Sequence, residues 1–156
     1  MPHNSLLAYF AAPLFNDRER DFNSTIVERI EQYVDVFLPQ RDGALLTDML
    51  AAGVSRLVAE HRVFDQDRQA MRSADILIAV LDGGYVDEGV AFEVGFMHAL
   101  GKLCIGLQTD VRRALPSGNN PMIAQGLSEI LGDVESLVLR VADLAQKKTK
   151  SDAMRA

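Results

Sequence analysis

The sequence predicts one α/β domain, in which a doubly wound parallel sheet of five strands carries helices on both faces. Segments with the apolar pattern of strands alternate along the chain with segments of helical periodicity. The run ILIAVL over residues 76–81 is continuously apolar, which is typical of a central strand covered on both faces. The length of 156 residues suits a single domain with a sizeable core. Together these observations indicate a parallel α/β architecture.

The five strands are expected where short apolar runs are bounded by turn residues. The first ends at Pro13, which cannot donate to a strand ladder, and Tyr9 falls near its carboxyl end. The flavodoxin-like order 2-1-3-4-5 is the expected topology. The first and third strands then lie side by side, and ligands bind at the carboxyl ends of strands at such a point. The predicted strands are residues 5–12, 34–38, 76–81, 103–107 and 136–139.

Helical periodicity is found between these strands. The segment 44–60 has more apolar residues than one sheet face covers, so a subunit interface could take up the excess. Asp65 or Asp67 is expected to cap a short helix that ends at Ala74. The other predicted helices cover residues 17–32, 89–101 and 120–130, and a closing helix starts at 141–146.

Composition and charge narrow the function classes. The net charge of −6 argues against a general affinity for nucleic acid, which requires basic surface to neutralise phosphates. The single cysteine, Cys104, permits no internal disulfide, which fits a reducing compartment. No secretory leader or membrane-spanning apolar run is evident, so a cytoplasmic protein is predicted. The domain is expected over residues 1–146, followed by a frayed tail over 147–156 without apolar periodicity.

The helix predicted over residues 89–101 carries the main chemical signal. It is apolar on nearly every side, and Glu93 is the acidic residue within it. A buried carboxylate loses hydration, so its pKa rises and it destabilises the fold unless partners compensate. Glu93 is therefore either a structural residue with satisfied partners or a functional one. Asp87 could cap the first turn, and it lies within about two helical turns of Glu93, close enough for both to share one small ligand.

The residues from Asp87 to Gly95 fit the pattern D-x-G-x-x-x-E-x-G, which resembles the motif of the nucleoside 2-deoxyribosyltransferases. These enzymes move 2-deoxyribose between nucleobases. Three further matches follow the family's order: Tyr9-Phe10 at the end of the first strand, the segment 67–75 before the central strand, and Asn120-Pro121-Met122 near the C-terminus. The resemblance covers roughly residues 6–140. Some members end in a tyrosine whose terminal carboxylate enters the site, and this chain lacks that residue.

The resemblance implies a retaining double displacement. Glu93 would attack the anomeric carbon and form a glycosyl ester, Tyr9 would hold the Glu93 carboxylate in place, and Asp87 would supply the proton to the departing base. Two interacting carboxylates titrate as a unit, so the residue that holds the proton stays open. A second base would then attack the ester from the same face, and water could replace that base in slow hydrolysis.

The resemblance also implies which residues contact the substrates, 2′-deoxynucleosides and free nucleobases. Asp67 would hydrogen-bond the base. Asn120 and Met122 form the N-x-M element that one subunit lends to its neighbour's site, so a homo-oligomer is expected. Gly89, the glycine of the D-x-G motif, is grouped with the substrate-binding residues, and Phe15 could stack on a flat base.

No metal or organic cofactor is expected, because the three histidines show no ligand spacing and no dinucleotide-binding or phosphate-binding glycine loop is present. One alternative is a 2-deoxynucleoside 5′-monophosphate N-hydrolase of the same fold. Those relatives tend to carry serine where this chain has Asp87 and Asn120, so these residues favour nucleosides. The other alternative is a non-catalytic module that senses nucleosides or nucleotides, but such a module has no need of a buried nucleophile such as Glu93.

Overall fold

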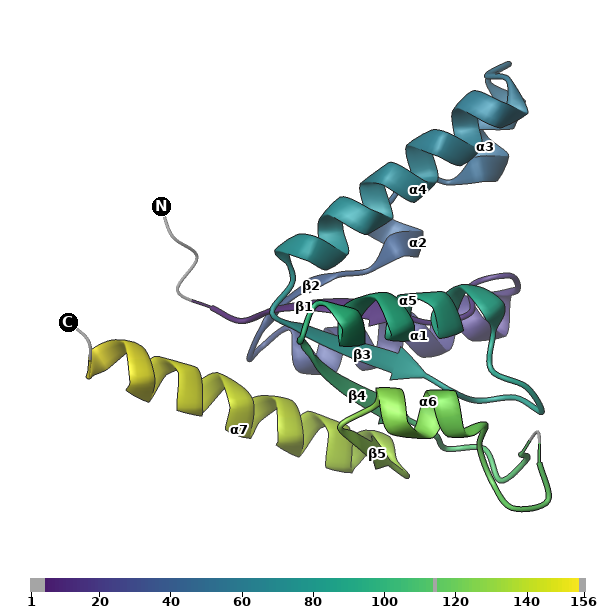
Figure 1. Cartoon of the computed structure of the whole chain (residues 1–156). Helices are drawn as coiled ribbons and strands as arrows, with labels where there is room; N and C mark the ends of the chain where they lie inside the picture. Colours follow the sequence, from purple (N-terminus) through teal and green to yellow (C-terminus); the bar gives the residue numbers. More distant parts are fainter. Residues whose placement is uncertain (1–4, 114, 155–156) are drawn as a thin grey trace.

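A parallel sheet forms the centre of the computed structural model, which describes residues 5–113 and 115–154 (Figure 1). Its order is β2-β1-β3-β4-β5, which confirms the topology predicted from the sequence. All neighbouring strands run parallel. The strands are β1 (Leu7–Ala11), β2 (Asp35–Phe37), β3 (Ile76–Val80), β4 (Leu103–Leu107) and β5 (Glu129–Leu131).

Alternation along the strands divides the core into two layers. On β1, Ala8 and Phe10 point to one face of the sheet, whereas Tyr9 and Ala11 point to the other. The first face is covered by α1 (Asp17–Ile30) and α7 (Val134–Ala153). The second is covered by α5 (Glu88–Ala99), by the C-terminal part of α4 (Arg56–Ser73) and by α6 (Pro121–Gly126). The period of two therefore places Tyr9 on the same side of the sheet as Glu93.

The segment between β2 and β3 differs from the prediction. The expected helix over 44–60 is divided into α3 (Leu46–Ala51) and α4, because Gly53 adopts a φ of 81° that turns the chain between them. The long helix α4 then continues to Ser73, so Asp65 and Asp67 lie in its interior and neither caps a helix. A short helix, α2 (Pro39–Asp42), precedes α3.

The C-terminal part of the chain also corrects the prediction. The last strand is β5, which overlaps the end of the segment 120–130 expected to be helical, and residues 136–139, expected as that strand, belong to α7. A strand of three residues offers too little alternation to be found from its pattern. Helix α7 extends to Ala153, so the expected frayed tail is helical over most of its length. Lys148 Nζ fastens it to the start of the sheet by donating to the Ser5 carbonyl oxygen at 3.0 Å.

Helix α5 is more exposed than its apolar composition predicts, and helices α3 and α4 are largely exposed as well. Helix α5 buries Val90, Val94 and Met97, but the side chain of Phe92 is 52% exposed. Helices α3 and α4 project away from the sheet, and within α4 only Ala59 and Met71 are buried (Figure 1). No helix in the described part of the chain has the length and apolar character needed to span a membrane.

Candidate active site

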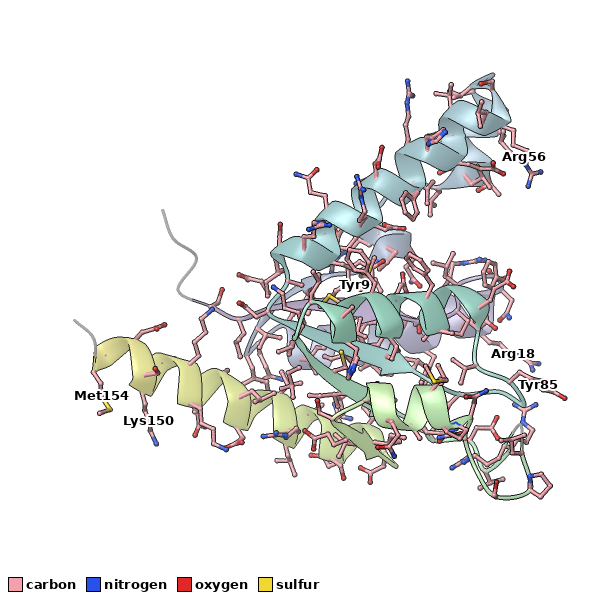
Figure 2. All side chains as sticks on the ribbon, in the orientation of Figure 1. Tyr9, Arg18, Arg56, Tyr85, Lys150 and Met154 are labelled. Atoms are coloured by element: carbon pink, nitrogen blue, oxygen red, sulfur yellow. The ribbon has the colours of Figure 1, made fainter. Side chains whose placement is uncertain are left out.

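The hydroxyl of Tyr9 donates a hydrogen bond of 2.6 Å to Glu93 Oε1. The two residues are 84 positions apart and meet because β1 and α5 pack on the same side of the sheet. The ring of Tyr9 stacks on Phe37, its register neighbour on β2, with centroids 5.6 Å apart. Tyr9 is fully buried, and Figure 2 labels it among the side chains of the fold. Its hydroxyl therefore holds one oxygen of the Glu93 carboxylate in a fixed place.

The D-x-G part of the motif forms the start of α5. Asp87 is the N-cap, and its Oδ2 accepts hydrogen bonds from the backbone N–H groups of Gly89 at 2.9 Å and Val90 at 3.1 Å. A Cβ atom at Gly89 would lie 3.0 Å from the same Oδ2, tighter than an ordinary contact. Glycine at this position therefore leaves room for the capping carboxylate, which confirms the capping predicted for Asp87.

Glu93 lines a cavity of about 350 Å³ between α4 and α5, which we call the Glu93 cavity. Asp67 lines it from α4, and Gly89 lines it from the first turn of α5. Asp67 on α4 and Gly89 on α5, which the resemblance links to substrate, therefore lie at the same cavity. Asp67 was also a candidate for a helix cap, but it lies inside α4. The full lining is Leu46, Glu60, Val63, Phe64, Asp67, Met71, Gly89, Phe92 and Glu93.

Two carboxyl groups of the Glu93 cavity, those of Glu93 and Asp67, have pKa values raised above their ordinary values. Burial raises the pKa of Glu93 to about 8; the hydrogen bond from Tyr9 opposes this rise, and the negative charges of Asp67 and Asp87 add to it. Burial also raises the pKa of Asp67 to about 6. The pKa of Tyr9 lies above its ordinary value because of burial and the charges of Glu93 and Asp67, so its hydroxyl remains a donor.

This arrangement has the parts that a glycosyl transfer needs. A carboxylate oxygen held by a fixed donor can attack or stabilise a carbon that develops positive charge. A second carboxyl group whose pKa lies near neutrality can exchange a proton with a leaving group. Glu93 and Asp67 supply these two groups within one largely apolar cavity.

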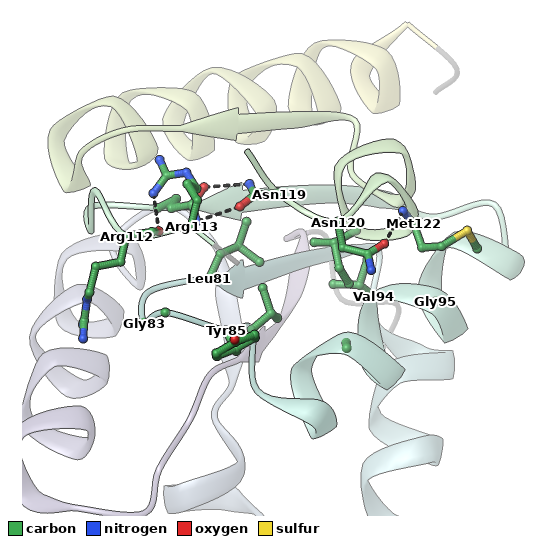
Figure 3. Close-up of a pocket in the computed structure, with 15 residues that line it drawn as sticks. Leu81, Gly83, Tyr85, Val94, Gly95, Arg112, Arg113, Asn119, Asn120 and Met122 are labelled. Atoms are coloured by element: carbon green, nitrogen blue, oxygen red, sulfur yellow. Dashed lines mark hydrogen bonds between the residues drawn. The ribbon is translucent and has the colours of Figure 1, made fainter. Parts of the chain in front are cut away.

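Asn120 and Met122 lie elsewhere in the same chain. Asn120 is the N-cap of α6, where its Oδ1 accepts from the Met122 N–H at 2.9 Å. Both line a second cavity of about 440 Å³ on the opposite side of α5, called here the Asn120 cavity (Figure 3). Met122 is 81% exposed. Within one chain, neither residue is among those that line the Glu93 cavity.

Phe15 is also separate from the Glu93 cavity. It is 73% exposed in the loop after β1 and is not among the residues lining that cavity. Asn16, next to it, caps α1 by accepting from the Glu19 N–H. The expected stacking role of Phe15 stays a prediction.

Sequence reasoning missed the apolar wall of the Glu93 cavity. Val63 and Phe64 of α4 face Phe92 of α5, and the rings of Phe64 and Phe92 have centroids 6.1 Å apart. The signal was present, because Glu60, Val63, Phe64 and Asp67 recur at helical spacing. This spacing predicts a shared helix face only if residues 56–73 are recognised as one continuous helix.

A sequence profile described as nucleoside 2-deoxyribosyltransferase matches residues 8–149. The chain belongs to this family. A search of curated protein sequences gave no match.

Solved structures extend the likeness over the whole domain. A conserved protein from Enterococcus faecalis V583 has a TM-score of 0.72 at 24% identity, over 89% of this chain and 98% of that one. A 2-deoxyribosyltransferase from Bacillus psychrosaccharolyticus gives 0.67 at 22% identity, over 85% and 90%. A deoxyribosyltransferase from Leishmania mexicana gives 0.64 at 19% identity, over 88% and 97%. At these identities the structures establish a shared fold, and the family assignment rests on the profile.

Proposed function

We propose that this family member transfers 2-deoxyribose between nucleobases, with Glu93 as the nucleophile. The observation that carries the proposal is the 2.6 Å hydrogen bond from Tyr9 to Glu93 inside a cavity that Asp67 also lines. A structural glutamate needs a partner but no cavity, whereas a nucleophile needs both. The family assignment supports the same chemistry.

The first half of the reaction transfers the sugar to the protein. A Glu93 oxygen forms a bond to the anomeric carbon while the bond from that carbon to the base nitrogen breaks, and the bonding electron pair leaves with the base. A proton is delivered to the base as it departs. The hydrogen bond from Tyr9 fixes Oε1, so Oε2 is the oxygen available for attack.

The second half returns the protein to its starting state. An incoming base attacks the anomeric carbon from the side that the first base left, the ester bond breaks, and Glu93 regains its carboxylate. A proton returns from the incoming base to the acid. Two inversions give net retention. Water in place of the base would give slow hydrolysis.

Two carboxyl groups compete for the role of acid. The motif assigns it to Asp87, and this stays a prediction. Asp67 is the stronger candidate on geometry, because it lines the Glu93 cavity and its pKa is about 6, whereas Asp87 Oδ2 is engaged at the helix start. The variants Asp67→Asn and Asp87→Asn separate the two, since asparagine also caps helices. The acid is the residue whose replacement lowers the rate of transfer most for nucleosides whose bases are poor leaving groups.

We further propose that Asn120 and Met122 act in the Glu93 cavity of a second subunit. Both lie at the start of α6, and the exposed Met122 is available for contact. Exposed aromatic side chains also border the Glu93 cavity at Phe64 and Phe92, which are 48% and 52% exposed. A second copy would cover this apolar surface and contribute an amide to the sugar.

The test is incubation of the purified protein with 2′-deoxyinosine and free adenine, and in parallel with a 2′-deoxynucleoside 5′-monophosphate alone. Formation of 2′-deoxyadenosine, followed by chromatography, is the expected result. Free base released only from the monophosphate would identify a nucleotide hydrolase instead. Binding without turnover of either substrate would indicate a sensing module.

A further inference from the structure

We propose that a second copy of this chain packs on the outer face of α5, with the two α5 helices parallel and Phe92 of each copy seated over Ala91 and Gly95 of the other. This inference rests on the proposed sharing of Asn120 between subunits, and it names the surface and the symmetry through which that sharing occurs. It is carried by the positions of the two cavities on either side of α5.

The outer face of α5 is apolar and uncovered in the described chain. A helix that is apolar on nearly every side is normally buried all round. The inner face of α5 packs against the sheet, whereas Phe92 is 52% exposed and Gly95 and Ala99 are exposed as well. These three residues are separated by three and then four positions, which is the spacing of a seam between paired helices. The outer face of α5 therefore has the composition and spacing of a surface that pairs with another helix.

Gly95 supports a close approach of a second helix. Glycine in a helix interior is less favourable than alanine, so it needs a reason. Gly89 in the same helix has one within the chain, because a Cβ atom there would lie 3.0 Å from the capping oxygen of Asp87. Outside the local helix backbone, a Cβ atom at Gly95 would meet no described atom within 4 Å. The space that Gly95 leaves open is thus available to a partner.

The placement of the two cavities determines the direction of the pairing. Helix α5 lies between α4 and α6, with the Glu93 cavity on its α4 side and the Asn120 cavity on its α6 side (Figure 1). If Asn120 of each copy serves the Glu93 cavity of the other, the α6 side of one copy must face the α4 side of its partner. A two-fold axis along α5 produces this arrangement and leaves the helices parallel. An axis across α5 would make the helices antiparallel and set like sides together.

The edges of α5 that meet in a parallel pair fit each other in size. A large side chain of one helix enters a hole between residues of the other in such a pair. Phe92 borders the Glu93 cavity, whereas Ala91 and Gly95 border the Asn120 cavity. The two-fold axis brings these edges together, so the ring of Phe92 meets two small residues of the other copy. The helices cross at an angle and separate toward Glu88, where like charges would repel.

The charges of the two cavities are also complementary. Among the lining residues that the structure describes, the Glu93 cavity has the acids Glu60, Asp67 and Glu93 and no base. The lining of the Asn120 cavity, over the same described residues, has Arg112 and Arg113 and no acid. Arg113 donates to the backbone carbonyl oxygens of residues 110 and 112, so its charge is not paired with a carboxylate by these bonds. The parallel arrangement sets the basic cavity of one copy against the acidic cavity of the other.

The first experiment measures molar mass by size-exclusion chromatography with light scattering. The wild type should be a dimer or a multiple of dimers, and Gly95→Leu should be monomeric, because leucine fills the space that receives Phe92. This variant should still unfold cooperatively, since a Cβ atom at Gly95 meets nothing in the chain outside its own helix. The control is Glu28→Leu, which adds an exposed leucine to α1 on the opposite face and should leave the mass unchanged.

The second experiment determines the direction of the helices by disulfide formation on mild oxidation. Ala99→Cys is combined with Cys104→Ala, which removes the single native thiol. Parallel helices bring position 99 of each copy to the same point of the seam, within the range of about 4.4–6.8 Å between Cα atoms that a disulfide spans, so a covalent dimer should form. In an antiparallel pair that crosses near Gly95, the two thiols would be about 12 Å apart along the helix axes. A mixture of Phe92→Cys and Ala99→Cys chains would crosslink instead.

The outcomes separate this inference from the proposed function. A monomeric wild type, or a Gly95→Leu variant that remains dimeric, would overturn the pairing through α5. Crosslinking of the Phe92→Cys and Ala99→Cys mixture, without crosslinking of Ala99→Cys alone, would overturn the parallel arrangement. Transfer of 2-deoxyribose is assayed on the same preparations. Transfer by a monomeric wild type would leave the role of Glu93 in place, whereas a dimer with the expected crosslink and no transfer would support the pairing and overturn the proposed function.

Discussion

Helix α5 has a cavity on each side, and the two differ in chemistry. It contributes Gly89, Phe92 and Glu93 to the Glu93 cavity, and Ala91, Val94 and Gly95 to the Asn120 cavity. The first holds carboxyl groups whose pKa values rise to about 8 and about 6.

The Asn120 cavity is lined by amides and arginines as well as apolar residues (Figure 3). Its buried Gln108 exchanges two hydrogen bonds with Asn119, at 3.1 Å and 2.8 Å. The guanidinium of Arg112 bonds the Asp110 carboxylate, which holds the pKa of Asp110 below its ordinary value. Gln108 and Asn119 are thus paired with each other, and Arg112 is paired with a carboxylate beside the cavity.

The comparison teaches that the size of a cavity does not identify the reacting side. In the larger cavity Gln108, Asn119 and Arg112 have hydrogen-bond partners, whereas the smaller one holds a carboxyl group kept in apolar surroundings at a cost to stability. Such a cost indicates function when a cavity gives substrate access to the group. The following experiments test whether chemistry is confined to the Glu93 side.

The largest effect is expected from Glu93→Ala. Removal of the nucleophile should lower kcat for transfer by about 10⁴-fold or more, because double displacement has no other path. The variant should still fold, because the stability gained by removing a desolvated carboxyl group offsets the loss of the acceptor for the buried Tyr9 hydroxyl. Glu88→Ala, an exposed acid in the same helix, is the matched control. Activity within a few-fold of the wild type would remove Glu93 as nucleophile.

Tyr9→Phe should lower kcat/KM by about ten-fold to a hundred-fold, the loss expected for one hydrogen bond to a charged group. The hydrogen bond lowers the pKa of Glu93, so its removal should raise that pKa. The rise of kcat/KM with pH should then occur at a higher pH than in the wild type. A purely structural Tyr9 would reduce activity without moving the pH profile, and this profile is the deciding measurement.

Asn120→Ala tests whether the two sides of α5 cooperate across subunits. It should lower kcat/KM by about ten-fold through loss of a sugar contact. If Asn120 serves a neighbour, mixing inactive Glu93→Ala subunits with Asn120→Ala subunits should restore activity, because mixed dimers contain one intact site. The control replaces Asn120→Ala by Asn119→Ala in the same mixture. Asn119 also lines the Asn120 cavity, but its side chain pairs with Gln108. An active monomer at high dilution would contradict the shared site.

The smallest effect concerns stability and pH. The pKa of Glu93 is about 8 in the folded protein against an ordinary value of 4.5, so the folded state binds more protons than the unfolded state between these pH values. Stability therefore falls as pH rises through this window. Urea denaturation should show a loss of about 2–4 kcal/mol between pH 5 and pH 8. Glu93→Gln should flatten this slope, and an unchanged slope would show that Glu93 is not its source.

The sequence by itself determined the sheet order and the chemical motif. The alternation of strand and helix segments along the chain predicts the sheet order, the apolar run of β3 marks a buried central strand, and the spacing from Asp87 to Glu93 places a cap and a carboxylate on one helix. The predicted adjacency of the first and third strands was enough to bring Tyr9 to the edge of the sheet where the turn from Asp87 to Glu93 lies. Local periodicity is sufficient in these places because each residue's position follows from its own element.

Only the tertiary structure decided the α4 wall of the Glu93 cavity and the position of the C-terminal strand. The turn at Gly53 separates α3 from α4. The angle at which α4 leaves the sheet determines the shape of the Glu93 cavity and places Asp67 and Glu60 in its lining. The β5 strand exists because it pairs with β4, since three residues carry too weak a pattern alone. The direction of a helix and the position of a three-residue strand depend on contacts between distant segments, which no local pattern encodes.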